Sequence, residues 1–248
     1  MRSLGSPPVT PAGWPIPTFG CRVVAAFPHD PLAFTQGLLW HRGALYESTG
    51  LIGRSTVREV RLRDGRVLRS VALPAEMFGE GLAGWGEEIV SQTYRDGVAF
   101  RWQARTLAPH GQHASPGEAW GLTSDGASLI RSDGTPVLRF LDPETLTERR
   151  SLPVTAAGRP LGWLNDLQWA EGAILANVLT LPALARIDPA SGQVVAWIDL
   201  SPLIVECAGG DPEKLANGVA FDAETGRLFV TGKNWPRLYE IAVDGDPR

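Results

Sequence analysis

One carboxylate, Glu80, stands between two glycines in the stretch FGEGLAGW. A carboxylate that is buried in a mostly apolar cavity without a charge partner has a raised pKa, and it can then exchange protons as a general acid or base. Lys233, in VTGKNW, could pair with such a carboxylate or face a developing oxyanion. Both residues also have ordinary interpretations: Glu80 could be a carboxylate that caps backbone N–H groups, and Lys233 a solvated surface lysine. Their positions in the fold decide between the functional and the ordinary interpretation.

The surroundings of Glu80 occur five times along the chain. The copies read TQGLLW, GEGLAGW, AWGLTSD, LNDLQWA and ANGVAFD, and they begin at Thr35, Gly79, Ala119, Leu164 and Ala216. Each copy is followed by a polar turn and a second β-rich run, and four units continue into a third and fourth strand around a turn such as Asp64-Gly65. Four strands repeated every 40 to 52 residues predict an all-β fold, a five-bladed β-propeller. A β-sandwich is the alternative, but it does not explain the repeat.

The two ends of the chain predict how the ring closes. The fifth unit stops at PRLYEIAVDGDPR, too soon to supply an outermost strand, whereas FGCRVVAAFP, Phe19 to Pro28, is a spare strand at the other end. Pairing that strand onto the last blade would close the ring and remove an exposed edge. We therefore expect a flexible proline-rich segment over residues 1–18 and a single propeller domain over residues 19–248. A helical turn is expected only near Pro212 to Leu215.

The register of the repeat brings side chains together at the mouth of a central funnel. The residue before each Gly-Leu pair, or before its equivalent, lies where an innermost strand begins. These anchor residues are Gln36, Glu80, Trp120, Asn165 and Asn217. A second ring follows the next strand of each blade and consists of Gly50, Tyr94, Gly134, Leu179 and Lys233. A small pocket with a few convergent polar groups is the usual place for a ligand.

Composition limits the partners of the chain. Hydrophobic residues make up 44% of the 248 residues and charged residues 20%, which is typical of a globular protein with a buried core. The net charge is −4 and the basic residues are scattered, which argues against a nucleic-acid surface. No run of about 18 apolar residues predicts a membrane span. Cys21 and Cys207 are expected to be unpaired packing residues.

A metal-dependent lactonase or similar hydrolase is a further reading, because propellers can hold a cation on their axis. Such a site needs several converging carboxylates or histidines. The ring of anchors contains one carboxylate, and the four histidines, His29, His41, His110 and His113, are expected in loops or turns. We therefore predict neither a metal nor a cofactor.

Several motifs together resemble a known family. DPLAFTQGL, YESTG, FGEGL, AWGL, LNDLQW, ANGVAFD and VTGKNWPRLYEI are similar, in order and spacing, to the glutamine cyclotransferase family of plant and bacterial type, which has five-bladed propellers. The resemblance runs from about Phe27 to Ile241. It implies conversion of the N-terminal glutamine of a peptide or protein to pyroglutamate with release of ammonia, without a catalytic zinc.

The resemblance also implies roles for individual residues. The glutamate of FGEG, here Glu80, is the proton-transferring group, and Lys233 and Asn165 belong to the same catalytic pocket. The substrate-binding positions implied by the family motifs and by the two rings are Phe34, Gln36, Phe78, Tyr94, Trp120, Leu179 and Asn217. The family usually carries tryptophan at the positions of Tyr94 and Leu179. Because aromatic walls confine a small substrate, this departure predicts weaker substrate binding, a shifted substrate or low activity.

Two matters stay open at this level. The alternative to an enzyme is a non-catalytic propeller that binds peptide N-termini. The N-terminal stretch lacks the apolar core of a signal peptide, so the expected compartment is the periplasm or exterior if a leader has been trimmed, and the cytoplasm otherwise. A monomer is expected.

Overall fold

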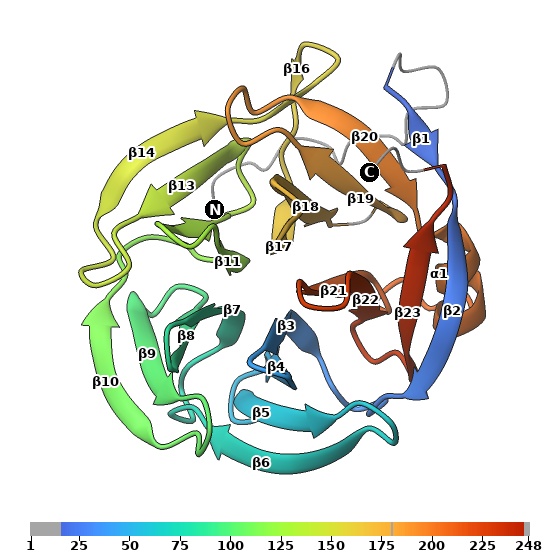
Figure 1. Cartoon of the computed structure of the whole chain (residues 1–248). Helices are drawn as coiled ribbons and strands as arrows, with labels where there is room; N and C mark the ends of the chain where they lie inside the picture. The colour runs from blue at the N-terminus through green and yellow to red at the C-terminus, as the bar shows by residue number, and fades with distance from the viewer. Residues whose placement is uncertain (1–15, 180, 246–248) are drawn as a thin grey trace.

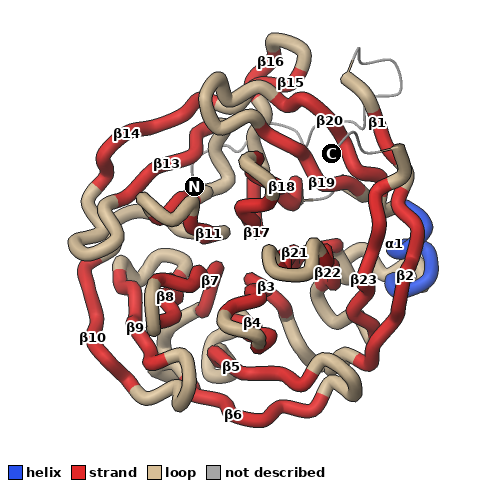
Figure 2. Tube along the Cα trace, in the orientation of Figure 1, coloured by secondary structure: helices blue, strands red, loops and turns tan. Residues whose placement is uncertain are grey.

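The computed structural model describes residues 16–179 and 181–245, and it confirms the predicted five-bladed β-propeller. Five sheets surround a central axis, and each sheet presents its innermost strand to that axis (Figure 1). Figure 2 shows that strands account for most of the ring and that loops and turns connect them.

Each blade consists of four antiparallel strands in consecutive order from the axis outward, except that the last blade takes its outermost strand from the N-terminal part of the chain. The strands of the first blade are β3 Thr35–His41, β4 Ala44–Thr49, β5 Thr56–Arg61 and β6 Arg66–Ala72. Those of the second are β7 Gly79–Trp85, β8 Glu88–Thr93, β9 Val98–Gln103 and β10 Pro109–Ala114. Those of the third are β11 Leu122–Ser124, β12 Leu129–Arg131, β13 Val137–Leu141 and β14 Glu148–Pro153. Those of the fourth are β17 Leu164–Ala170, β18 Ala173–Val178, β19 Ala183–Ile187 and β20 Val194–Asp199, and those of the fifth are β21 Ala216–Asp222, β22 Arg227–Gly232, β23 Arg237–Val243 and β2 Cys21–Pro28.

The predicted closure of the ring is confirmed. β2 pairs antiparallel with β23 from Cys21 opposite Val243 to Pro28 opposite Arg237, so the two ends of the chain share the fifth blade. A short strand, β1 Thr18–Phe19, also pairs in parallel with β20 of the fourth blade. The flexible segment predicted over residues 1–18 falls largely on residues 1–15, which lie outside the described residues, and Thr18 already belongs to β1.

The connections contain two elements that the sequence pattern did not indicate. The helix α1, Ser201–Ala208, connects the fourth and fifth blades in the chain and lies at the periphery of the fifth blade in the view of Figure 2, upstream of the turn expected at Pro212 to Leu215. It begins at a proline in its first turn and ends at Gly209, whose φ of 58° is left-handed. A small hairpin, β15 Thr155–Ala156 with β16 Arg159–Pro160, links the third and fourth blades. Within the described residues no helix is long and apolar enough to cross a bilayer.

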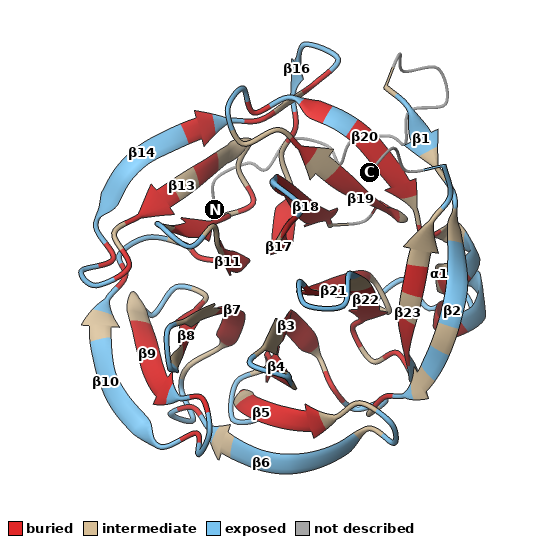
Figure 3. Cartoon of the chain, viewed as in Figure 1, coloured by how far each residue is buried: buried red, intermediate tan, exposed pale blue. Residues whose placement is uncertain are grey.

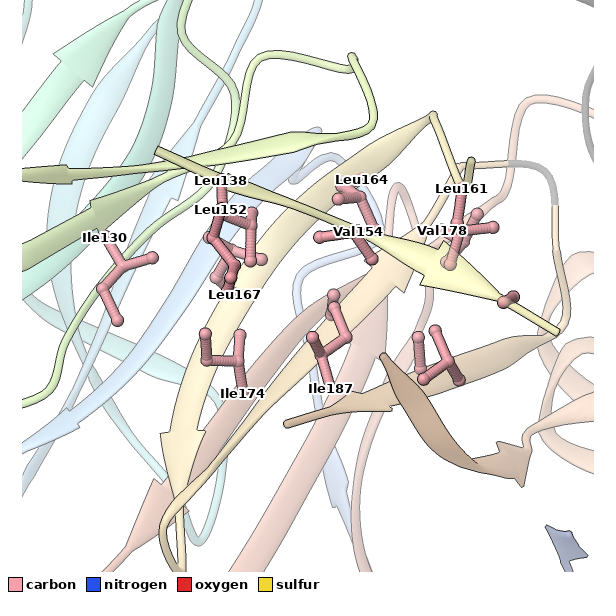
Figure 4. Packing of buried hydrophobic residues seen from close by; sticks show 14 of the residues in the cluster. Ile130, Leu138, Leu152, Val154, Leu161, Leu164, Leu167, Ile174, Val178 and Ile187 are labelled. Carbon is pink, nitrogen blue, oxygen red and sulfur yellow. The ribbon is translucent and has the colours of Figure 1, made fainter. Parts of the chain in front are cut away.

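The hydrophobic core lies between the blades. The described residues form five apolar clusters, and each cluster joins two neighbouring blades around the ring. Figure 4 shows the cluster between the third and fourth blades, where Ile130 and Leu138 of one sheet meet Leu167 and Ile174 of the other. The inner strands are therefore covered on both faces, whereas outermost strands such as β6 and β14 are mostly exposed (Figure 3). The two cysteines are unpaired, and Cys207 is buried in the cluster between the fourth and fifth blades.

Candidate active site

Four of the five anchor residues lie in β-bulges at the beginning of an innermost strand. The pairing of that strand with its neighbour shifts register between Thr35 and Gly37, Gly79 and Leu82, Leu164 and Leu167, and Ala216 and Val219. An extra residue in one strand bends it and turns a side chain away from the regular alternation. The bulges therefore present Gln36, Glu80, Asn165 and Asn217, and Trp120 lies just before β11 of the remaining blade.

The glycines beside Glu80 allow the innermost strands to approach closely. The Gly81 N–H donates a hydrogen bond of 2.6 Å to the carbonyl of Trp120 in the next blade. A Cβ at Gly81 would lie 2.5 Å from the backbone nitrogen of Leu122, a distance that no side chain tolerates. A Cβ at Gly79 would lie 2.8 Å from the carbonyl oxygen of Thr49. Neighbouring backbone atoms leave no room for a side chain at positions 79 and 81, so both residues are glycines. The side chain of Glu80 points away from these contacts, so a charged residue can stand between the two glycines.

Glu80 is buried and carries an unpaired oxygen. Its side chain is 5% exposed, and Oε2 has no hydrogen-bond partner. Burial raises the pKa of Glu80 well above its usual range, the positive charge of Lys233 opposes the rise, and the negative charges of Glu118 and Asp166 add to it. The carboxyl therefore has the electrostatic setting of a group whose protonated form is favoured and that can take and return a proton.

Lys233 lies in the same pocket and is also buried, with 8% of its surface exposed. Burial lowers the pKa of Lys233, and the charge of Glu80 works in the opposite direction. The ammonium nitrogen Nζ lies 4.6 Å from the centroid of the Phe34 ring, within the range of a cation–π contact. Since burial disfavours both charges while each charge favours the other, Glu80 and Lys233 form one electrostatic unit.

The three amide anchors, Gln36, Asn165 and Asn217, differ in how many of their hydrogen bonds are made within the protein. Asn217 is fully buried, and its Nδ2 donates to the carbonyl of Thr35 at 3.0 Å and to Oε1 of Gln36 at 3.2 Å. Asn217 is therefore committed to holding the fifth and first blades together, and it also orients Gln36. Asn165, by contrast, is 3% exposed and its Oδ1 is buried without a partner, so this acceptor remains available.

Aromatic side chains form an arc on one side of Glu80. The Phe34 and Phe78 rings meet edge to face with centroids 6.3 Å apart, and Phe78 and Tyr94 are 6.0 Å apart. The Phe78 ring also lies over Gly50, where a Cβ would approach to 2.5 Å, so the second-ring glycine makes space for it. The structure thus brings these three predicted residues together.

A second group of aromatic rings consists of Trp120, in the third blade, and Trp163, which precedes the first strand of the fourth blade and was not singled out from the sequence. The two rings meet at 62° with centroids 6.3 Å apart, and Trp120 lies over Gly134 of its own blade. Leu179 is placed beside this group, because its N–H donates to the carbonyl of Trp163 at 2.8 Å. The backbone of Trp163 therefore lies next to Leu179, one of the two positions where the family carries tryptophan. Trp163 is two residues before Asn165, as Phe34 and Phe78 are before their anchors, and this spacing could have revealed it.

Two further carboxylates near the site were missed. Asp166 is fully buried, and its Oδ2 accepts from the backbone N–H groups of Leu38 at 3.2 Å and Val219 at 2.9 Å, while Oδ1 has no partner. Burial raises its pKa to about 8, and the backbone hydrogen bonds oppose the rise. The signal was present in LNDL, where aspartate takes the place that glycine has in all four other copies.

Glu118 connects Tyr94 to Trp120. Its Oε1 accepts from Nε1 of Trp120 at 3.1 Å, and its Oε2 forms an ion pair with Arg95 at 3.2 Å. Burial raises the pKa of Tyr94 to about 12, and a hydrogen bond to Glu118 adds to the rise. Glu118 therefore fixes the two aromatic side chains on either side of it.

The expectation that the histidines lie in loops or turns needs correction. His110 and His113 lie in β10 and His41 ends β3, rather than in loops or turns. His29 is in a connection, but it is buried and contacts Oε1 of Glu47 at 2.9 Å and the carbonyl of Trp235 at 2.6 Å. Trp235, two residues after Lys233, is fully buried and its ring meets that of Tyr239 with centroids 6.4 Å apart, so it belongs to the core. Across residues 16–179 and 181–245, no three metal-ligating side chains are grouped as they would be around a metal ion.

The geometry defines a small site for proton transfer. One buried carboxyl, one buried amine, a free amide oxygen and aromatic side chains from four blades lie at the start of the innermost strands. Such a site can hold a small polar group between its amides and move a proton at Glu80. Because burial raises the pKa of Glu80, the site favours general acid–base catalysis over nucleophilic attack by the carboxylate.

Comparison with known proteins gives consistent results. The model of a family described as glutamine cyclotransferase matches residues 6–243. The chain is 41% identical over 227 residues to a glutaminyl-peptide cyclotransferase from Arabidopsis thaliana, and the alignment covers 89% of this chain and 70% of that protein. It also resembles the crystal structure of Myxococcus xanthus glutaminyl cyclase with a TM-score of 0.88 and 35% identity, over 92% of this chain and 98% of that one.

Proposed function

This chain belongs to the glutamine cyclotransferase family, and from that membership we propose that it acts as a glutaminyl-peptide cyclotransferase at the site around Glu80. The substrate is a peptide or protein whose first residue is glutamine. Its α-amine attacks the side-chain amide carbon, a C–N bond forms in the new five-membered ring, and the bond to the amide nitrogen breaks. The products are pyroglutamate at the N-terminus and ammonia.

Much of the barrier is lowered by the shape of the pocket. The attack is intramolecular, so a pocket that holds the glutaminyl side chain folded back onto its own amine removes most of the entropic cost. The arc of Phe34, Phe78 and Tyr94 on one side and Trp120 on the other supports this folded pose. Leu179 and Trp163 complete the wall next to Trp120.

Glu80 carries the proton transfer, and its burial with an unpaired oxygen is the single observation on which this role depends. The α-amine loses a proton when it attacks, and the leaving amide nitrogen must gain one. A carboxylate with a raised pKa accepts the first proton and donates it to the second nitrogen, so one group serves as base and then as acid.

The polar neighbours stabilise charge and hold the substrate. Lys233 faces the oxyanion that develops on the amide oxygen and also limits the pKa of Glu80. Asn165 offers its free Oδ1 to the amine or amide N–H groups of the substrate. Gln36 contacts the substrate with the part of its amide that Asn217 leaves free, so Asn217 acts by positioning.

The test of Glu80 is release of ammonia from a glutaminyl dipeptide. We expect Glu80→Gln, which keeps the shape of the side chain, to lower kcat by about a hundredfold or more, since general acid–base groups contribute on that order. Asn217→Gln or similar changes are unsuitable controls because Asn217 holds two blades together. Arg149→Gln, on the exposed outer strand β14, is a better one and should retain full activity.

Equal ammonia release by the parent protein and Glu80→Gln would remove the role of Glu80. If the parent protein released no ammonia but bound peptides with N-terminal glutamine, the non-catalytic alternative would be favoured.

A second experiment concerns the two positions where this chain departs from its family. We expect Tyr94→Trp combined with Leu179→Trp to raise kcat/KM for a glutaminyl dipeptide about threefold to tenfold, mainly through a lower KM, because each indole adds aromatic contact area. The measurement is steady-state kinetics on the same dipeptide. An unchanged kcat/KM would mean that Trp163 already supplies the missing wall.

A further inference from the structure

A cleft beside the candidate active site has a charge distribution that no part of the proposed reaction uses. It lies between the second and third blades, has a volume of about 940 Å³, and is lined in part by Arg95, Glu118, Arg131, Asp133, Arg139 and Glu148. This volume is at the upper end of the range of pockets that bind small molecules.

The three arginines of the cleft differ in their partners. Arg95 pairs with Glu118 at 3.2 Å, and Arg139 pairs with Asp133 at 3.1 Å and with Glu148 at 2.8 Å. Arg131 forms no ion pair with a described residue; its Nη1 donates to the neutral Oγ of Ser115 at 3.1 Å and to the carbonyl of Pro116 at 3.4 Å.

Arg131 is nevertheless buried. It is 7% exposed, and its Nε is buried without a hydrogen-bond partner. Burial lowers the pKa of its guanidinium, and the more distant carboxylates of Asp133 and Glu148 oppose this only in part. A buried cation without a charge partner is costly, and an anion that enters the cleft would remove that cost. Arg131 therefore marks the anionic end of a ligand.

The cleft is continuous with the wall of the active site. Glu118 lines the cleft and at the same time accepts a hydrogen bond from Trp120, an anchor of the funnel. Asp133, on the other side of the cleft, precedes Gly134, on which the Trp120 ring lies. Glu118 is thus shared by the cleft and the aromatic side of the funnel, so a peptide chain that leaves the funnel beside Trp120 would reach the cleft.

We propose that this cleft binds the part of the substrate peptide that follows its N-terminal glutamine, and that Arg131 selects an acidic side chain or the C-terminal carboxylate there. The inference rests on the proposed function, since the glutamine must occupy the funnel. An extended peptide advances about 3.3–3.6 Å per residue, so the selected carboxylate belongs to a residue a few positions after the glutamine and not to the glutamine itself.

The experiment compares substrates. The protein is assayed with glutaminamide, with an amidated hexapeptide Gln-Gly-Ala-Ala-Ala-Ala, and with four versions of it that carry one glutamate at positions three to six. We expect one or two of these versions to give a kcat/KM about tenfold above that of the neutral hexapeptide, which is the scale of one charge-assisted hydrogen bond. The preference should appear in KM and should weaken between about 0.05 and 0.5 M salt.

The variant Arg131→Gln tests the assignment to this residue. It should lose the preference for acidic peptides and keep the parent rate on glutaminamide, which is too short to reach the cleft. Arg149→Gln removes one positive charge from the exposed strand β14 of the same blade, outside the cleft lining, and should keep the preference. If Arg131→Gln does not fold, as judged by its circular dichroism spectrum, the salt dependence of the parent protein decides.

The outcomes separate this inference from the proposed function. Failure of the parent protein to release ammonia from every substrate, glutaminamide included, would overturn the proposed function. Turnover of glutaminamide with equal kcat/KM for all hexapeptides would leave the function in place and overturn the role of the cleft. A preference that survives in Arg131→Gln, or one that salt does not weaken, would also overturn it.

Discussion

Asp166 is the residue that departs most from the repeat. In its blade it occupies the place of a glycine, and its carboxyl is directed to the backbone of two other blades, at Leu38 and Val219. Burial of a carboxyl group without a cationic partner costs less free energy when the group is protonated and neutral. The neutral carboxyl can serve as acceptor for both N–H groups through one oxygen, so Asp166 holds three innermost strands together without a charge.

The pKa of Asp166 sets a testable dependence of stability on pH. Burial raises this pKa from 3.8 in the unfolded chain to about 8 in the folded protein. The stabilisation from the neutral group is therefore fully present below pH 3.8 and is lost progressively as the pH rises through about 8. Asp166→Asn stays neutral at every pH and keeps an acceptor for both N–H groups.

We expect the melting temperature of Asp166→Asn to exceed that of the parent protein at pH 8.5 by about 3 °C or more, and the difference to shrink towards pH 4.5. Thermal unfolding followed by circular dichroism at four or five pH values measures this. A difference that is the same at every pH would show that the carboxyl does not titrate in this range. Asp64→Asn, an exposed carboxylate on a hairpin turn, serves as the control that should show no such trend above pH 5.

The innermost strands depend on bulges and glycines together. A bulge turns the anchor side chain toward the funnel, and a glycine such as Gly81 allows the next blade to approach within one hydrogen bond, 2.6 Å between its nitrogen and the carbonyl oxygen of Trp120. Any residue larger than glycine at position 81 would strain the strand β7, because the atoms that its Cβ would meet belong to the backbone of the next blade.

We expect Gly81→Ala to destabilise the protein by about 2 kcal/mol or more, since the strand β11 of the third blade would have to move away. The measurement is the free energy of unfolding in guanidinium chloride. Gly20→Ala is the matched control, because its Cβ would meet only the end of the Asp244 side chain, at 3.0 Å. Equal stability of the two variants would mean that the innermost strands can separate at little cost.

The sequence predicted these elements well where they repeat, and poorly where they do not. The spacing of Gln36, Glu80, Asn165 and Asn217 placed four anchors correctly, because a repeated pattern fixes register. Asp166 and Glu118 were missed because each occurs in one blade and its role depends on contacts with a neighbouring blade. Trp163 was missed although it repeats the place of Phe34 and Phe78, because the comparison of the copies began at the anchor motifs themselves. The helix α1 was missed because eight residues, Ser201–Ala208, give too short an apolar pattern.

The whole molecule is closed by a strand from the opposite end of the chain. β2 covers the edge of β23, and Phe27 of β2 packs against the core between the fifth and first blades. The fold and the family of the whole chain could be predicted from the sequence, because every blade contributes one copy of the repeated pattern. The position of the cleft could not, because its lining combines residues of the second and third blades and of the connection between them, which the repeat does not encode.

Removal of the closing strand should open the ring. We expect a chain that begins at His29 to lose cooperative thermal unfolding and to aggregate, because β23 becomes an exposed edge next to uncovered apolar residues. Adding a synthetic peptide of residues 16–28 during refolding should restore the transition. A shortened chain with the same melting temperature as the full chain would show that the pairing of β2 with β23 is dispensable for stability.

The bulges have a consequence for how such pockets diversify. Gln36, Glu80 and Asn165 each leave the backbone at an irregularity whose pairing does not use the side chain, so one of them can be exchanged while the strands stay in place. Substrate choice can therefore drift blade by blade over evolution without loss of the scaffold. Asp166 and Asn217 lack this freedom, since their side chains fasten separate blades to each other.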